Sequence, residues 1–257
     1  MKKVVLIFMA SAVCLLGVNA QTVDEIIGKY HQSIGGVDKL KSHTSTKAIG
    51  KAPTPQGDFP FEFYQEKPNK IKVVIDIMGQ KMVAQAYDGQ TAWMLNPFTG
   101  GIAEKLPDEQ AKSVVSDAEL EDPFLDYSSK GHEVTLEGIE DVQGVPCHKI
   151  RLIKYKGNAD KESTQFFYFD KETSMPIMTK TSVKVGDQAG QEIETYLSDY
   201  QEVEGGMIMP FSFEVKMAGQ VVQSMVFEKI TINEDIPDEE FRFPEEEQKE
   251  QEEAEAE

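Results

Sequence analysis

The sequence is poor in cysteine, with Cys14 and Cys147 as its two cysteines among 257 residues. Cys14 lies in residues 1–20, which resemble a cleavable export signal: a basic start, an apolar run from Val4 to Val18, and a small residue, Ala20, at the cleavage point. We therefore expect export to the periplasm and cleavage after Ala20. Cys147 then remains alone, so the core has to form without an intramolecular disulfide.

Two further readings of this segment are disfavoured. Residues 11–14 lack the branched aliphatic and small residues that usually precede a lipid-attached cysteine, so we do not expect lipidation at Cys14. The run from Val4 to Val18 is shorter than the roughly 18–20 residues of a membrane-spanning helix, and no later segment comes closer. We expect no transmembrane segment in the mature chain.

Basic residues are also few. Without the signal, 24 lysines and arginines face 45 acidic residues, a formal balance of −21. Coulomb repulsion at this charge disfavours nucleic acid and anionic lipid surfaces as partners. Residues 245–257 contribute eight glutamates and no aromatic or branched residue, which predicts a disordered acidic tail. This tail serves solubility or, alternatively, docks on a basic partner.

Catalytic and metal-binding patterns are missing. The four histidines have no paired metal-ligand spacing, and there is no nucleophile elbow, phosphate-binding loop or dinucleotide fingerprint. Cys147-His148 is the most suggestive pair, but neighbours on a strand point to opposite faces. We expect no catalytic residues, no metal and no cofactor, and predict that the protein is not an enzyme.

Helical signals occur in two places. Thr22-Val23-Asp24-Glu25 has the spacing of a capping box, and apolar residues follow at helical spacing up to Gly35-Gly36. Between Asp108 and Tyr127, helical spacing predicts two short helices inserted between strands.

The rest of the chain alternates with period two, as in Phe59, Phe61 and Phe63, and is divided by short turns such as Asp88-Gly89. Sequential strands with short turns predict an antiparallel meander. The fold class is mainly β (α+β): an incomplete antiparallel β-barrel of about ten strands over residues 21–244, with an N-terminal helix and inserted lid helices. Helices this few cannot cover the whole sheet. We therefore expect an apolar hollow between the sheet and the helices.

The order of these motifs resembles the LolA/LolB-like family of outer-membrane lipoprotein-sorting proteins, from Ile26 to Phe243. The pieces that carry the resemblance are residues 30–40, Gly50-Lys51, residues 87–93, 136–138, 142–144, 168–176, 198–210 and 238–244. The resemblance implies an incomplete barrel, a helical lid and a hydrophobic cavity that shields acyl chains. Carriers of this kind latch the lid with a basic residue on an early strand, and Lys51, beside Ala52-Pro53, is not a clear match.

An acyl-binding face needs large, adaptable apolar side chains. We predict that the cavity is lined by apolar strand residues and covered by apolar lid residues, although sequence alone leaves open which strand face points inward, and Trp93 is core or cavity floor. The predicted lining residues are Phe61, Phe63, Ile75, Trp93, Phe167, Phe169, Met178, Phe211, Phe213, Met225 and Phe227, and the lid residues are Val114, Val115, Phe124 and Leu125.

Three functional hypotheses follow. The first is a periplasmic binding protein for an acylated lipoprotein or lipid, acting in lipoprotein sorting or lipid transport with an envelope donor or acceptor protein. The second is an interaction module of the same fold that binds another envelope protein without lipid. The third is an enzyme. The first predicts a continuous apolar hollow, and the second a filled concavity and an apolar patch elsewhere.

Overall fold

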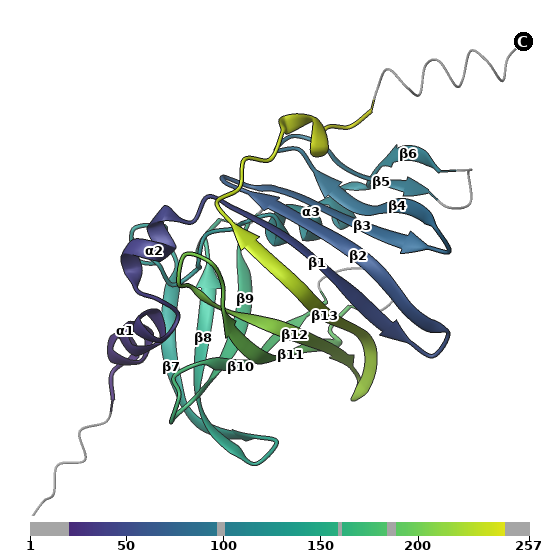
Figure 1. The fold of residues 1–257 in the computed structure, drawn as a ribbon. Coiled ribbons are helices and arrows are strands. Elements are labelled where there is room, and N and C mark those ends of the chain that lie inside the picture. The colour runs from purple at the N-terminus through teal and green to yellow at the C-terminus, as the bar shows by residue number, and fades with distance from the viewer. Residues whose placement is uncertain (1–20, 97–100, 159–160, 184–188, 245–257) are drawn as a thin grey trace, which may run out of the picture.

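The computed structural model describes residues 21–96, 101–158, 161–183 and 189–244. The predicted export signal and acidic tail lie outside these ranges. The described residues form one antiparallel sheet of 13 strands, more than the ten or so expected, with three α-helices and a short 3-10 helix (Figure 1). The helices are α1 (Val23–Ser33), α2 (Val37–Ser42), α3 (Asp108–Asp117) and the 3-10 helix Asp238–Glu240; the strands are β1 (Ser45–Thr54), β2 (Gly57–Glu66), β3 (Lys70–Ile77), β4 (Gln80–Tyr87), β5 (Ala92–Asn96), β6 (Ile102–Lys105), β7 (Glu133–Val142), β8 (Val145–Lys154), β9 (Ser163–Asp170), β10 (Pro176–Ser182), β11 (Glu192–Glu202), β12 (Ile208–Met217) and β13 (Gln220–Ile232).

The sheet is a meander with a single long-range pairing. Its order is β6-β5-β4-β3-β2-β1-β13-β12-β11-β10-β9-β8-β7, so every strand except β1 and β13 pairs only with strands adjacent in sequence. The two edge strands, β6 and β7, are consecutive in the chain, and residues 106–132 connect them. The sheet curls without closing, which confirms the predicted incomplete antiparallel barrel (Figure 1).

The N-terminal helix begins at the predicted capping box. The Thr22 hydroxyl accepts a hydrogen bond from the Glu25 backbone N–H at 3.2 Å, and the Glu25 carboxylate accepts one from the Thr22 N–H at 3.1 Å. Gly35, with φ +117°, lies where a Cβ would be 2.8 Å from the Gly206 carbonyl oxygen. The Ile208 N–H also donates to the Ile34 carbonyl at 3.0 Å, so the end of α1 docks on the turn between β11 and β12.

The predicted pair of inserted helices is half right. α3 forms at Asp108–Asp117, but Pro123–Tyr127, predicted as a second helix, consists of turns. Asp122 accounts for the difference, because its Oδ1 accepts hydrogen bonds from the Phe124 and Leu125 backbone N–H groups at 2.9 and 3.1 Å and so stabilises a turn. No helix among the described residues has the length and apolarity needed to span a bilayer.

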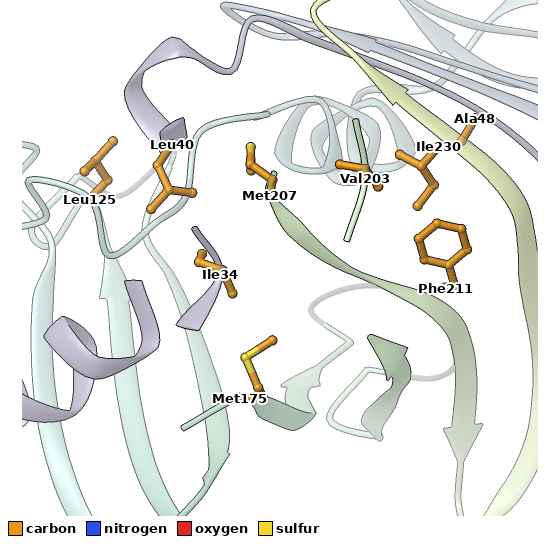
Figure 2. Packing of buried hydrophobic residues seen from close by; sticks show 9 residues of the cluster. All are labelled: Ile34, Leu40, Ala48, Leu125, Met175, Val203, Met207, Phe211 and Ile230. Atoms are coloured by element: carbon orange, nitrogen blue, oxygen red, sulfur yellow. The ribbon is translucent and has the colours of Figure 1, made fainter. Parts of the chain in front are cut away.

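The largest core cluster joins the helices to the turns at one end of the sheet. Nine buried side chains converge there, from the end of α1, from α2, from the connection between α3 and β7, from the connections that follow β9 and β11, and from strands β1, β12 and β13 (Figure 2). This packing fixes the N-terminal helices against the sheet. The cluster consists of Ile34, Leu40, Ala48, Leu125, Met175, Val203, Met207, Phe211 and Ile230.

Candidate ligand-binding face

The two faces of the curled sheet can be followed through its register. Phe167 of β9 pairs with Ile150 of β8 and with Thr179 of β10, which in turn pairs with Thr195 of β11 and then Val215 of β12. Paired residues lie on the same face, so these side chains trace one surface. We call the face covered by α1 and α3 the inner face and the opposite one the outer face.

Four aromatic rings cluster at the middle of the inner face. The Phe227 ring centroid lies 5.2 Å from that of Phe61, 6.1 Å from that of Phe63 and 5.6 Å from that of Phe213, each in edge-to-face geometry. Phe61 is buried, whereas the other three are half-buried. This aromatic cluster (Phe61, Phe63, Phe213, Phe227) therefore keeps apolar surface accessible on a concave face.

A glycine in β1 makes the cluster possible. Gly50 pairs with Phe61 on β2 and with Phe227 on β13, next to a register shift in β1. A Cβ on Gly50 would lie 2.7 Å from Cζ of Phe61, closer than real Cβ contacts allow. The absence of a side chain lets the two rings meet above the strand.

Two covering elements flank the cluster. On one side, Phe124 from the connection 118–131 packs with its ring centroid 4.8 Å from that of Phe167 and 5.6 Å from that of Phe169. On the other side, Val114 and Val115 of α3 pack in the cluster that includes Ile71, Tyr87 and Phe63. The four predicted lid residues thus lie in the connection between the two edge strands, over the inner face.

Asp122 ties the connection to α1. Its carboxylate accepts a hydrogen bond from the Tyr30 hydroxyl at 2.7 Å and lies 3.2 Å from Nε2 of His31, while also capping the turn at Phe124 and Leu125. Burial, and secondarily the Asp122 charge, raise the pKa of the Tyr30 hydroxyl, so this group remains a donor. Sequence reasoning missed this contact because it joins residues 92 positions apart.

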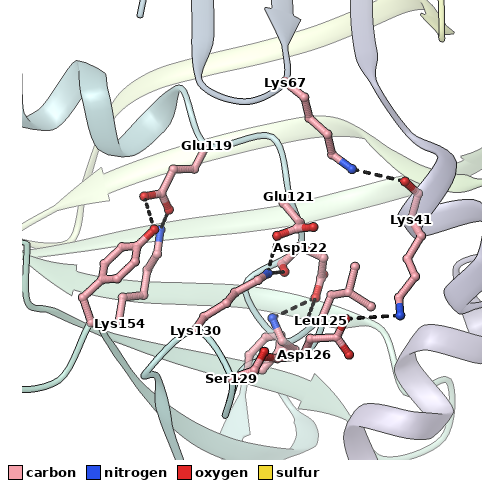
Figure 3. Close-up of polar contacts among 12 residues, drawn as sticks. Lys41, Lys67, Glu119, Glu121, Asp122, Leu125, Asp126, Ser129, Lys130 and Lys154 are labelled. Carbon is pink, nitrogen blue, oxygen red and sulfur yellow. Dashed lines mark hydrogen bonds and ion pairs between the residues drawn. The ribbon is translucent and has the colours of Figure 1, made fainter.

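Further polar contacts hold the same connection against β8 and α2 (Figure 3). Glu119 pairs with Lys154, a buried lysine of β8, and accepts a hydrogen bond from the Tyr155 hydroxyl at 2.8 Å. Asp126 pairs with Lys41 of α2 at 3.2 Å. Lys51, near the latch position that the resemblance suggests, instead pairs with Asp58 across the β1–β2 hairpin at 3.4 Å.

Most predicted lining residues share the inner face. Phe169, Phe211 and Phe61 are buried in the core, and the others are half-buried. Their common face follows from the strand register and from the clusters in which they pack. The predicted lining residues on the inner face are Phe61, Phe63, Ile75, Phe167, Phe169, Phe211, Phe213, Met225 and Phe227.

Trp93 was predicted among the lining residues and instead packs on the outer face. Its indole N–H donates to the Phe241 carbonyl at 2.9 Å, and its ring lies 6.0 Å from that of Phe243. The residues after β13 return across the sheet and cover this tryptophan. The alternative prediction, that Trp93 is a core residue, is confirmed, because 4% of its surface is exposed.

Met178 is the second lining residue on the outer face. It pairs with Tyr168 on β9 and with Tyr196 on β11, and packs with Tyr168, Cys147 and Val142 in an outer-face core cluster. A register shift separates Pro176 from Met178 in β10, and the prediction, made from the size and apolarity of the side chain, did not include the strand face.

Cys147 and His148 point to opposite faces of β8. Cys147 packs in the outer-face cluster, whereas His148 pairs with Phe169, an inner-face residue. Burial raises the pKa of the Cys147 thiol to about 11, which leaves little thiolate near neutral pH. Within the part of the chain that the structure describes, no three histidine, cysteine or carboxylate side chains gather as metal ligands would.

Two open surface depressions lie among the described residues, and neither is lined by the aromatic cluster. One, of about 300 Å³, lies on the strands β9–β11 around Phe166 and Lys180. The other, of about 590 Å³, is a groove between α1 and the turn 124–129. The large apolar hollow expected from sequence is not one of these two, because the rings on the inner face pack against each other.

Comparisons with known proteins show the fold. No family model and no curated protein matches the sequence. Among solved structures, a DUF1329 family protein from Desulfovibrio piger is similar at 13% identity and a TM-score of 0.57, covering 87% of this chain and 98% of its own. A LolA superfamily protein from Nitrosomonas europaea is similar at 11% identity and a TM-score of 0.56, covering 87% and 99%.

A third similar structure is a putative outer membrane lipoprotein-sorting protein domain from Vibrio parahaemolyticus, at 9% identity and a TM-score of 0.52, covering 85% of this chain and 95% of its own. These alignments extend over nearly the whole of each known chain. Together with the unclosed 13-stranded sheet, they confirm the fold-level resemblance expected from the order of the motifs. The chain therefore has the incomplete-barrel fold of LolA-like proteins.

Proposed function

We propose that this protein binds the acyl chains of a lipid or lipoprotein on its inner face, as an exported carrier of the bacterial periplasm. The supporting observation is the half-buried aromatic cluster on the concave side of an unclosed sheet. Each methylene moved from water onto such a surface contributes about 0.8 kcal/mol, so a long chain gains substantial binding energy. Similar structures described as lipoprotein-sorting proteins support the same ligand class.

The ligand enters between the sheet and the connection 106–132. Rings of the aromatic cluster now contact each other, so an acyl chain has to separate them and displace the connection from the inner face. Met225, which is half-buried and pairs with Phe213, adds a flexible side chain at the same place. The carrier thus closes on itself when empty.

Native mass spectrometry of the mature protein purified from the envelope tests this proposal, with extraction and analysis of bound lipid. We expect co-purified acylated species that are lost in Phe213→Asp. Val222→Asp is the matched control, because Val222 is 58% exposed in β13. An apo mass for the wild type, with no uptake of added lipopeptide, overturns the proposal.

A second candidate function is an envelope interaction module that binds another protein without lipid. The observation that favours it is the location of the larger depression, which lies outside the aromatic cluster. A wild-type protein that takes up no lipid but binds a protein partner supports this alternative.

A further inference from the structure

The groove between α1 and the turn 124–129 has an apolar floor, made by residues of α1 and of the connection that covers the inner face. It measures about 590 Å³. Ile27, Phe124 and Leu125 line it and are otherwise 5% exposed or less, and Val37 at its rim is 40% exposed. A groove with a buried apolar floor and an exposed apolar rim is suited to receive a side chain from another molecule.

Gly28, which is exposed, leaves open space beside α1 at one wall of the groove, and we call this space the notch. Gly28 lies within α1, where glycine is less favourable than alanine. A Cβ at this position would meet nothing within 4 Å, so internal packing does not require a glycine. The missing side chain instead leaves room for an incoming group to approach the helix backbone closely.

The charge of the lining selects the partner. Asp24 and Asp126 are among the lining residues, which include no lysine or arginine. Asp126 is paired with Lys41 at 3.2 Å, but both side chains are more than half exposed, so an incoming cation can replace Lys41 at little cost. The whole chain has 45 acidic and 26 basic residues, which favours approach of a cationic segment.

We propose that this groove docks a cationic, apolar polypeptide segment of a partner protein. An apolar side chain of the partner occupies the notch beside Gly28 and contacts Ile27 and Phe124, and a flanking lysine or arginine pairs with Asp126 or Asp24. The groove and the aromatic cluster share no lining residue, although Phe124 and Leu125 of the groove belong to the connection that covers the inner face. The peptide test below contains no lipid, so its outcome and that of the acyl-binding test are distinguishable.

A synthetic peptide tests the proposal with the full mature chain. The probe is a fluorescein-labelled 14-residue peptide with leucine on one helical face and lysine on the other, measured by fluorescence anisotropy. We expect saturable binding that Gly28→Leu and Asp126→Lys each weaken by at least about tenfold, since an anchoring side chain loses its pocket or its counter-charge. Gly28→Ala fills less of the notch and weakens binding less.

Asp58→Lys is the matched control, because Asp58 is also an exposed carboxylate paired with one lysine. Binding to this variant stays at the wild-type level. The proposal is overturned if the wild type does not bind, if a peptide with glutamate in place of lysine binds equally, or if Asp58→Lys loses as much affinity as Asp126→Lys. A wild-type dimer that Gly28→Leu dissociates, or binding to neutral phospholipid vesicles that Gly28→Leu abolishes, overturns it in favour of those occupants.

Discussion

The indole N–H of Trp93 donates to the carbonyl oxygen of Phe241 at 2.9 Å, across 148 positions of sequence. The contact places residues 236–243 on the outer face of the sheet, where Phe241 is fully buried and Glu240 pairs with Lys72 of β3 at 3.0 Å. Residues beyond the last strand are therefore part of the folded core.

Truncating Phe243 is expected to destabilise the protein. Phe243→Ala removes the ring that packs against Trp93 and should lower the free energy of unfolding by about 3 kcal/mol. Urea denaturation followed by Trp93 fluorescence measures the change. Arg242→Ala, whose side chain is 64% exposed, should stay within about 0.5 kcal/mol of the wild type. Equal midpoints for the two variants would contradict a structural role for this segment.

Asp122 is expected to be the residue that holds the connection 118–131 on α1. Asp122→Ala leaves the buried Tyr30 hydroxyl and the Phe124 N–H without their acceptor, and should lower the free energy of unfolding by about 2 kcal/mol. Asp126→Ala breaks an exposed pair and should lower it by less than about 1 kcal/mol. Chemical denaturation compares the two, and the reverse order of effects would refute the assignment.

Stability should decline in mild acid. Burial lowers the pKa of His43, His132 and His148 below their ordinary 6.5, so these side chains are neutral in the folded protein. The contribution of these neutral histidines to the free energy of unfolding is complete above pH 6.5. It is lost as the pH falls from 6.5 through their lowered pKa values in the folded protein, because the histidines of the unfolded chain bind protons first. We expect a lower Tm at pH 5 than at pH 7.5.

The control for this pH dependence is His43→Gln. Burial is the largest cause of the lowered pKa of His43, so this histidine is expected to contribute to the loss of stability in acid. The variant removes one titrating group, so its Tm should fall less between pH 7.5 and pH 5 than that of the wild type. An equal fall in Tm for the two proteins between pH 7.5 and pH 5 would count against His43 as a source of the acid sensitivity.

Two glycines in the N-terminal region should respond in opposite directions to alanine. Gly28→Ala should stabilise the protein by up to roughly 1 kcal/mol, because the new Cβ meets open space in a helix. Gly35→Ala should destabilise it, because Gly35 has φ +117° and a Cβ would press on the Gly206 carbonyl. The Tm values of both variants, measured by thermal unfolding, test these two expectations. A lower Tm for Gly28→Ala than for the wild type would mean that the space beside Gly28 is not empty.

Local patterns predicted much of this fold. The capping box at Thr22 and Glu25 and the alternation of Phe59, Phe61 and Phe63 depend on neighbours within a few residues, and both are present as expected. Alternation alone does not specify which face is inner. Most candidate residues nevertheless share one face, because alternation holds along uninterrupted stretches of strand.

The errors arise where distant contacts or register shifts intervene. Trp93 faces outward to meet a segment 148 positions away, and Met178 follows a shift in the register of β10. Asp122 converts an expected helix into a turn through side-chain hydrogen bonds to its own backbone. The apolar hollow was inferred from the small number of helices and stays a prediction, and the mutual packing of aromatic rings could not be predicted from composition.

The order of the sheet has a consequence for how the chain folds. Twelve strand pairings link the 13 strands, and only that of β1 with β13, from Thr46 with Ile232 to Lys51 with Val226, joins segments far apart in sequence. Forming it closes a loop of nearly the whole protein, so we expect two hairpin arrays to assemble early and this seam to be the slow step. A circular permutant that starts at β7 and ends at β6 would turn the seam into a local connection and should fold faster to the same barrel.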